Sequence, residues 1–348
     1  QRRPGGAAVL TLAEVFEVLH EAHRVLRPGG AAVLTTEYAL GDGGYLLPGV
    51  NAWDAEVLEG VRRSFGGFEW LGPCDLSFDT THPANAPRVR RHLPAGRQQP
   101  HARRFAEAFR GGHVGVLLGV SVCVPIAFVL RKTEGRNLTW SEAEVGDELR
   151  AYTDGVGRFL ADREAEALAV LEPLDGALAA RPERRQMALH AGRYMIDAHA
   201  RLGAQRQPKV FRQRIEAYLE RCPTGELQDA DCLDLCAYLL GEMGFHDASA
   251  EVSRRCLRSP SASADHVYDL AGRFLRYEKR AGRLRPAIDE VAGYLADLLW
   301  TGYPGDEVRR RVAEAIDPEL GRRERARLRA AVGAAWREVA SDLAGRWR

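Results

Sequence analysis

The sequence predicts a two-part chain, with an α/β domain over residues 1–132, a linker at 133–140 and an all-helical domain over residues 141–348. Three observations predict this. A helix pattern, a glycine turn and an apolar strand follow one another near the start, which is half of an α/β unit. Helical periodicity then dominates the second part, with almost no strand signal. A chain of 348 residues can also bury two separate cores.

The composition is that of a globular protein, with 45% apolar and 28% charged residues. The 49 basic residues nearly balance the 48 acidic ones, so there is no excess charge to attract nucleic acid or an anionic membrane. The last helix is rich in arginine, but Glu319 and Glu324 interrupt it and no aromatic residues are interleaved. We expect it to be a solvated face, and we expect no nucleic-acid or membrane partner.

The cysteine and histidine pattern predicts no metal site. Cys232 and Cys236 lie four residues apart on an expected helix, but no second pair or histidine completes a zinc pattern. His20 and His23 share one side of a helix without a third ligand, and we expect both to be solvated. Reduced, buried thiols and the lack of a signal-peptide pattern predict a cytoplasmic protein.

One stretch, Val114–Leu130, has seventeen residues without a charge and allows two interpretations. A membrane-spanning helix needs about 20 apolar residues, so this stretch is at the short limit. It also contains glycine, proline and six valines, which favour one or two buried strands. We expect strands; a membrane-tethered protein is the alternative and predicts detergent-dependent solubility.

The first expected element is a helix over residues 11–27, where Thr11 and Glu14 have the spacing of a capping box. Pro28-Gly29-Gly30 ends this helix, and residues 31–36 follow as a short buried strand. The later expected elements are a loop at 37–51, a helix at 54–65, a strand at 68–78, an irregular insertion at 79–100, a helix at 103–109 and a strand at 120–131.

Residues 19–30 read LHEAHRVLRPGG, and VLTT follows at 33–36. This run closely resembles the helix, turn and fifth strand of class I S-adenosylmethionine-dependent methyltransferases. The resemblance extends less sharply to about Lys132. It implies a partial Rossmann-like sheet that ends in two antiparallel strands, for which 68–78 and 120–131 are suitably placed.

The family binds its cofactor with a glycine-rich loop after the first strand and an acidic residue at the end of the second, both upstream of the matching run. Residues 3–11 repeat residues 27–35 without a change, which resembles a duplication or an assembly artefact rather than that loop. We therefore expect the intact parent to use S-adenosylmethionine, but this chain to lack the cofactor-binding half, to hold no cofactor and to be inactive alone. We also expect residues 1–132 to be poorly stable alone.

Ligands in this fold bind at the carboxyl ends of the strands. The resemblance therefore implies that Thr36, Tyr38 and Trp53 border a pocket for the methyl acceptor. Glu37 is a candidate to orient or deprotonate an acceptor hydroxyl, or it merely caps the loop. His82 is a second candidate base, or a surface histidine in a loop.

Three segments of the second part repeat a pattern of helix, glycine and helix around Gly203, Gly244 and Gly282, which are 41 and 38 residues apart. These spacings are typical of helical-hairpin repeats, and the third segment resembles the tetratricopeptide pattern. A single hairpin cannot bury its apolar face, so we expect the hairpins to stack into an irregular α-solenoid.

Two functions follow from these observations. The first is a fragment of an S-adenosylmethionine-dependent methyltransferase that acts on a small-molecule or glycan-like acceptor, with the helical region selecting substrate or a protein partner. The alternative is a non-catalytic helical-repeat interaction scaffold, in which the α/β part is structural.

Overall fold

The computed structural model describes residues 11–40, 46–47, 50–72, 116–118, 121–179, 181, 184–222, 230–258, 264–300 and 305–346. The chain divides into two compact units, Gln1–Ala204 and Gln205–Arg348. The first unit therefore includes the expected linker at 133–140 and three of the helices that follow it. The compact-unit boundary thus lies later in the chain than the change in sequence pattern.

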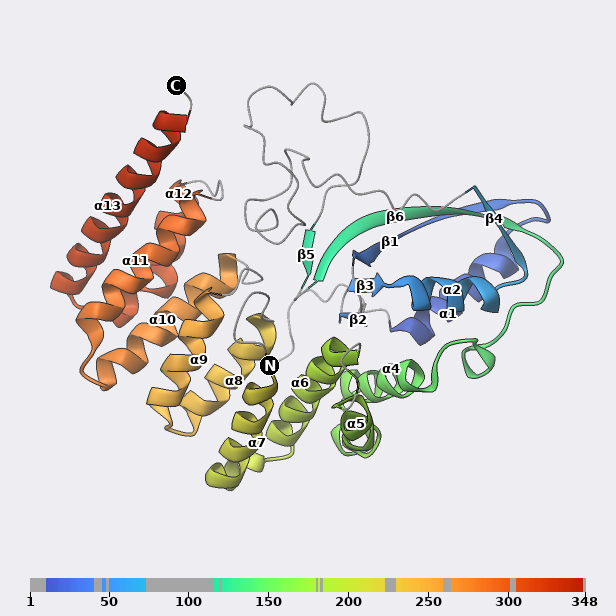
Figure 1. Cartoon of the computed structure of the whole chain (residues 1–348), viewed down its shortest axis with the longest axis horizontal. Helices are drawn as coiled ribbons and strands as arrows, with labels where there is room; N and C mark the ends of the chain where they lie inside the picture. The colour runs from blue at the N-terminus through green and yellow to red at the C-terminus, as the bar shows by residue number, and fades with distance from the viewer. Residues whose placement is uncertain are drawn as a thin grey trace. The chain divides into compact units, whose positions relative to one another are not determined.

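The first unit contains a mixed sheet with the strand order β2-β3-β1-β6-β4, and β5 also pairs with β6 (Figure 1). Strand β6 runs antiparallel to both β1 and β4, whereas β1 and β3 are parallel. The strands are β1 (Ala31–Leu40), β2 (Leu46–Leu47), β3 (Val50–Trp53), β4 (Phe68–Leu71), β5 (Val116–Leu118) and β6 (Ser121–Lys132).

The strand expected at 31–36 is longer than predicted, because β1 continues to Leu40. Ten consecutive residues of β1 pair with β6, from Ala31 opposite Arg131 to Leu40 opposite Val122. This long ladder keeps the chain extended through residues that were expected to begin a loop. Of the strand expected at 68–78, residues 68–71 form β4, and residues 73–78 lie outside the described part, as do the expected elements at 79–100 and 103–109.

The uncharged stretch Val114–Leu130 contributes β5 and most of β6, so its described residues are strands, as expected. Among the described residues, no helix is long and apolar enough to cross a membrane.

Helix α1 (Leu12–Val25) begins and ends where its sequence signals predict. The Thr11 hydroxyl accepts a hydrogen bond from the amide of Glu14, and the Glu14 carboxylate accepts one from the Thr11 amide, which completes the capping box. After the helix, Gly29 has a φ of 73°, a conformation that glycine adopts without strain. This turn leads the chain directly from α1 into β1.

The two faces of the sheet differ in burial. One face presents Ile126, Phe128 and Leu130 to the buried side chains of α1 and of α2 (Ala55–Ser64). We call this the covered face. The other, the outer face, carries the exposed Val33 and Val129, which pair directly across β1 and β6. Alternation of successive side chains along each strand produces this difference.

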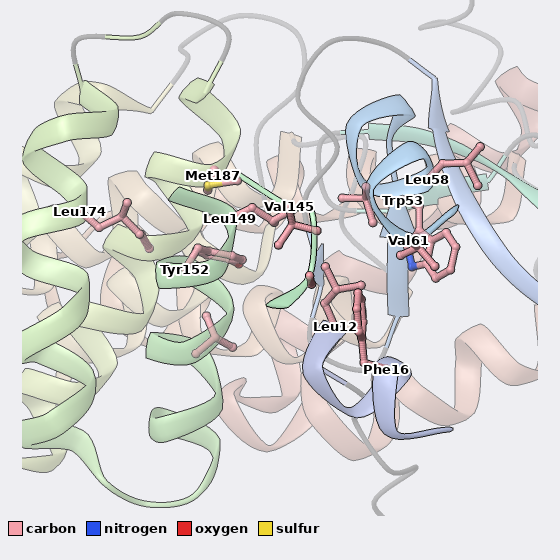
Figure 2. Packing of buried hydrophobic residues seen from close by; sticks show 14 of the residues in the cluster. Leu12, Phe16, Trp53, Leu58, Val61, Val145, Leu149, Tyr152, Leu174 and Met187 are labelled. Carbon is pink, nitrogen blue, oxygen red and sulfur yellow. The ribbon is translucent and has the colours of Figure 1, made fainter. Parts of the chain in front are cut away.

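Three further helices of the first unit share the core of the covered face: α4 (Asp147–Leu160), α5 (Glu164–Ala179) and α6 (Arg185–Arg201). In Figure 2, Val145 and Leu149 lie between Met187 of α6 on one side and Leu12 and Phe16 of α1 on the other. The Arg184 guanidinium, just before α6, also bonds to Glu56 of α2 at 2.5 Å. The sheet and these helices therefore form one packed body, which explains why the unit extends to residue 204.

Residues 133–138 are fastened to the sheet and to α1. The Gly67 amide donates to Oδ1 of Asn137 at 2.8 Å, and the Leu138 amide donates to the Ser64 carbonyl at 2.7 Å. His20 and His23 were expected to be solvated, but both are half-buried. Their Nε2 atoms lie 2.9 Å from the Leu138 carbonyl and 3.1 Å from the Thr133 carbonyl, as in hydrogen bonds that hold this segment against α1.

The second unit is helical throughout its described residues, so the prediction of a helical domain is confirmed. Gly244 and Gly282 each end a helix with a positive φ, 84° and 74°, and a second helix follows each of them. Gly203, which follows α6, has a φ of 87°. The helices of this unit are α7 (Pro208–Arg221), α8 (Ala230–Glu242), α9 (His246–Arg258), α10 (Ala264–Arg280), α11 (Leu284–Trp300), α12 (Gly305–Ala315) and α13 (Arg322–Arg346).

Across the described residues of both units, short 3-10 turns lie at Trp140–Glu142, Ala204–Arg206 and Asp317–Glu319.

Candidate functional site

The candidate residues Thr36, Glu37 and Tyr38 all lie within β1, not in a loop beyond its end. Consecutive side chains of a strand point to opposite faces. Tyr38 packs against the core of the covered face, and Thr36 lies on the same face opposite Ile126. Glu37 therefore points to the outer face. The structure thus separates the three neighbours into one outer residue and two covered ones.

Trp53 lies beside Tyr38, because β3 pairs in parallel with β1 at this position. The Trp53 side chain is only 2% exposed and stacks on Phe128, with ring centroids 5.5 Å apart and an interplanar angle of 18°. Trp70 meets the same Phe128 ring edge-on at 5.1 Å. Trp53 is accordingly part of an aromatic cluster in the core, and its indole Nε1 is buried without a hydrogen-bond partner.

Glu37 has the one carboxylate on the outer face of the central strand β1 within the described residues. Its Oε2 atom is buried and has no hydrogen-bond partner. Desolvation by burial raises the pKa of this carboxyl above its ordinary value, because water is lost around the charged form. An unsatisfied, partly desolvated carboxyl is a common feature of functional sites, since it is a stronger base than a solvated one.

Among the described residues, Cys123 is the titratable neighbour of Glu37 on the outer face. It pairs with Ala39, and Glu37 pairs with Pro125, so the two side chains are diagonal neighbours across β1 and β6. Burial, with a smaller contribution from the charge of Glu37, raises the pKa of the Cys123 thiol to about 12. The sequence predicts only that the thiols are reduced and buried, because the position of Cys123 beside Glu37 depends on the β1–β6 register.

His82 lies outside the described residues, so its position relative to Glu37 remains a prediction. Within the described part of the chain, no group of three or more histidine, cysteine, aspartate or glutamate side chains is arranged to hold a metal ion. The five described cysteines are all buried, as expected: Cys123, Cys222, Cys232, Cys236 and Cys256.

Comparisons of the chain with protein-family models, with curated protein sequences and with solved structures each found no match.

Proposed function

We propose that the first unit is the acceptor side of an S-adenosylmethionine-dependent methyltransferase, and that its substrate is a small molecule or glycan with a hydroxyl group. The single observation that carries this proposal is the buried Oε2 atom of Glu37, which has no hydrogen-bond partner and belongs to a carboxyl with a raised pKa on the central strand of the sheet. The acceptor hydroxyl would donate to Glu37, which would orient it and accept its proton.

The proposal rests on the family resemblance, and part of the local fold is compatible with it. The run that resembles the methyltransferases forms α1, a turn with Gly29 at positive φ, and β1. The resemblance implies a Rossmann-like sheet whose last strands are antiparallel, and β4 and β6 pair in that way. In this proposal β1 is the last of the parallel strands, and β6 lies between it and β4.

The cofactor would supply the methyl group. On the outer face, the described positions beside Glu37 are Cys123, Pro125 and Ala52, which offer no amide cradle or acidic pair for an adenosyl group. The described residues therefore do not fit the cofactor, and the proposal concerns only the acceptor. For that step, Glu37 contributes by placing the hydroxyl oxygen and by accepting its proton.

The proposal is tested with the natural gene product that carries this sequence. It is incubated with radiolabelled S-adenosylmethionine and an extract of small molecules and glycans, and the transferred label is counted. Glu37→Gln is expected to lower transfer by roughly 100-fold or more, the usual contribution of a general base. Glu69→Gln is the matched control, because Glu69 is an exposed carboxylate on the same face that pairs with Arg131. Wild-type transfer no higher than in a protein-free blank would refute the proposal.

A second function, an interaction scaffold, is favoured by the helix–glycine–helix pattern of the second unit. Gly244 and Gly282 both make the reversal between paired helices, and the Tyr238 side chain on α8 is 45% exposed. Stacked hairpins of this kind, as in an α-solenoid, present surfaces that bind peptides and proteins. Cross-linking of the full chain to its partner tests this: cross-links are expected on α8, where Tyr238 is exposed, and cross-links confined to the first unit would argue against it.

A further inference from the structure

We propose that Cys123 is a positioning residue for Glu37: its buried side chain forms a dry wall beside the carboxyl on the outer face of the sheet. This inference rests on the proposed function of Glu37 as the base of the acceptor site. It assigns to β6, a strand that carries none of the predicted site residues, a direct part in that site.

The register of the sheet brings the two side chains together. Glu37 faces Pro125 and Ala39 faces Cys123 along the antiparallel pair of β1 and β6. Cys123 and Glu37 therefore share one face, at a diagonal separation of about 7–8 Å between their Cα atoms. Long side chains bridge that separation, and the Glu37 carboxylate is close enough to affect the thiol by its charge.

Cys123 is more deeply buried than Glu37, as expected for a side chain that keeps water away from the carboxyl. Cys123 is 0% exposed, whereas Glu37 is only partly buried, with Oε2 enclosed and unpaired. A buried thiol is a poor hydrogen-bond donor and behaves as a small apolar side chain. It therefore fills space beside the carboxyl, whose Oε2 atom has no hydrogen-bond partner and is available to a substrate hydroxyl.

No other charged group accounts for the state of Glu37 among the described residues that face it. The neighbouring outer-face positions are Thr35 and Ala39 on β1, Ala52 on β3, and Pro125 with Cys123 on β6. Arg131, the nearest basic residue on the outer face of β6, pairs opposite Ala31 and bonds to Glu69. Cys123 is thus the one titratable side chain in this set.

The test is a titration of Glu37 in the full chain by ¹³C NMR of labelled glutamate, with the Glu37 signal identified by its loss in Glu37→Gln. In Cys123→Ser, the hydroxyl can donate to the ionised carboxylate, so the acid dissociation constant of Glu37 is expected to rise at least roughly threefold. In Cys123→Ala, water enters the vacated space and the constant is expected to rise by a smaller factor. In Cys123→Val, which keeps the wall apolar, it should stay within about 1.5-fold of wild type.

An unchanged dissociation constant in both the Ser and the Ala variants would overturn the inference. So would a Val variant that rises as much as the Ser variant. The titration does not depend on catalysis, so the two proposals fail separately. If Cys123→Ser changes the titration of Glu37 while Glu37→Gln keeps full methyl transfer, the role of Cys123 beside the carboxyl is supported and the proposed role of Glu37 as a base is wrong.

Discussion

Gly135 lies so close to Gly66 that a Cβ atom on Gly135 would overlap the Gly66 carbonyl oxygen. The contact is between two stretches of backbone, so no side-chain rotation can relieve it. It belongs to the same junction as the hydrogen bonds that fasten residues 133–138 to α1 and to the turn before β4. This junction joins the sheet to the helices that follow it in the first unit.

Replacement of Gly135 by alanine is therefore expected to destabilise the first unit by about 1–3 kcal/mol, the usual cost of forcing atoms into a well-packed region. Hydrogen exchange followed by mass spectrometry of β4 and β6 measures the effect locally. Gly176→Ala in α5 is the control: nothing lies within 4 Å of its added Cβ, so a gain of up to about 1 kcal/mol is expected. Equal protection of β4 and β6 from hydrogen exchange in Gly135→Ala and Gly176→Ala would contradict the close packing of Gly135 against Gly66.

The second unit offers an independent test at Gly241 in α8. A Cβ atom there would overlap the hydroxyl of Tyr277, a side chain that is 3% exposed and stacked on His246. We expect Gly241→Ala to destabilise this unit by about 1–3 kcal/mol, because the buried ring cannot move aside freely. Gly293→Ala in α11, with nothing within 4 Å, should instead be neutral or stabilising. Denaturant unfolding followed by circular dichroism compares the two.

Glu278 is a buried carboxylate that joins α9 and α10 to the start of α11. Its side chain is 2% exposed and bonds to Arg283 at 2.7 Å and to Arg254 at 3.3 Å. We expect Glu278→Gln to lower the free energy of unfolding by about 1–3 kcal/mol, because it removes the charge that both guanidinium groups face. Glu251→Gln is the matched control: Glu251 also pairs with Arg254, but its side chain is 62% exposed, so a change below about 0.5 kcal/mol is expected. A larger loss in the control would contradict this assignment.

Stability should also depend on pH through Glu37. Burial raises its pKa in the folded state above the ordinary value, so ionisation favours the unfolded chain. The stability that the neutral Glu37 side chain contributes is fully present below the ordinary glutamate pKa of about 4.3. It is lost as the pH rises through the pKa that Glu37 has in the folded state. The melting temperature of Glu37→Gln is therefore expected to rise relative to that of the wild type as the pH increases from about 4 to about 7. A difference that is constant over this range would exclude a raised pKa.

Burial also raises the pKa of Asp54, whose Oδ1 caps α2 by accepting from the Val57 amide at 2.8 Å. Its pH dependence has the same sign as that of Glu37. The two contributions to the pH dependence of the melting temperature are separated by comparing Glu37→Gln with the double variant Glu37→Gln and Asp54→Asn. The asparagine side chain can still cap the helix, so only the titration of Asp54 is removed.

The elements that local signals define could be predicted from the sequence. The capping box at Thr11, the Pro28-Gly29-Gly30 turn and the positive-φ glycines at Gly244 and Gly282 each act within a few residues, and the structure has them as expected.

Features that depend on distant contacts could not be predicted. The length of β1 follows from its ten-residue ladder with β6, about 90 residues later in the chain. The roles of His20 and His23 follow from carbonyl groups 118 and 110 residues away. The proximity of Cys123 to Glu37 likewise requires the strand register, and the shared core of the sheet and α4–α6 requires the packed structure.

The pH profile of methyl transfer by the natural gene product is the most direct test of the role given to Glu37. If Glu37 accepts the proton of the acceptor, the rate should rise with pH along a limb whose midpoint lies above the ordinary glutamate pKa. This limb should be absent from the residual activity of Glu37→Gln. A limb that persists unchanged in Glu37→Gln, with transfer at the wild-type rate, would contradict the account.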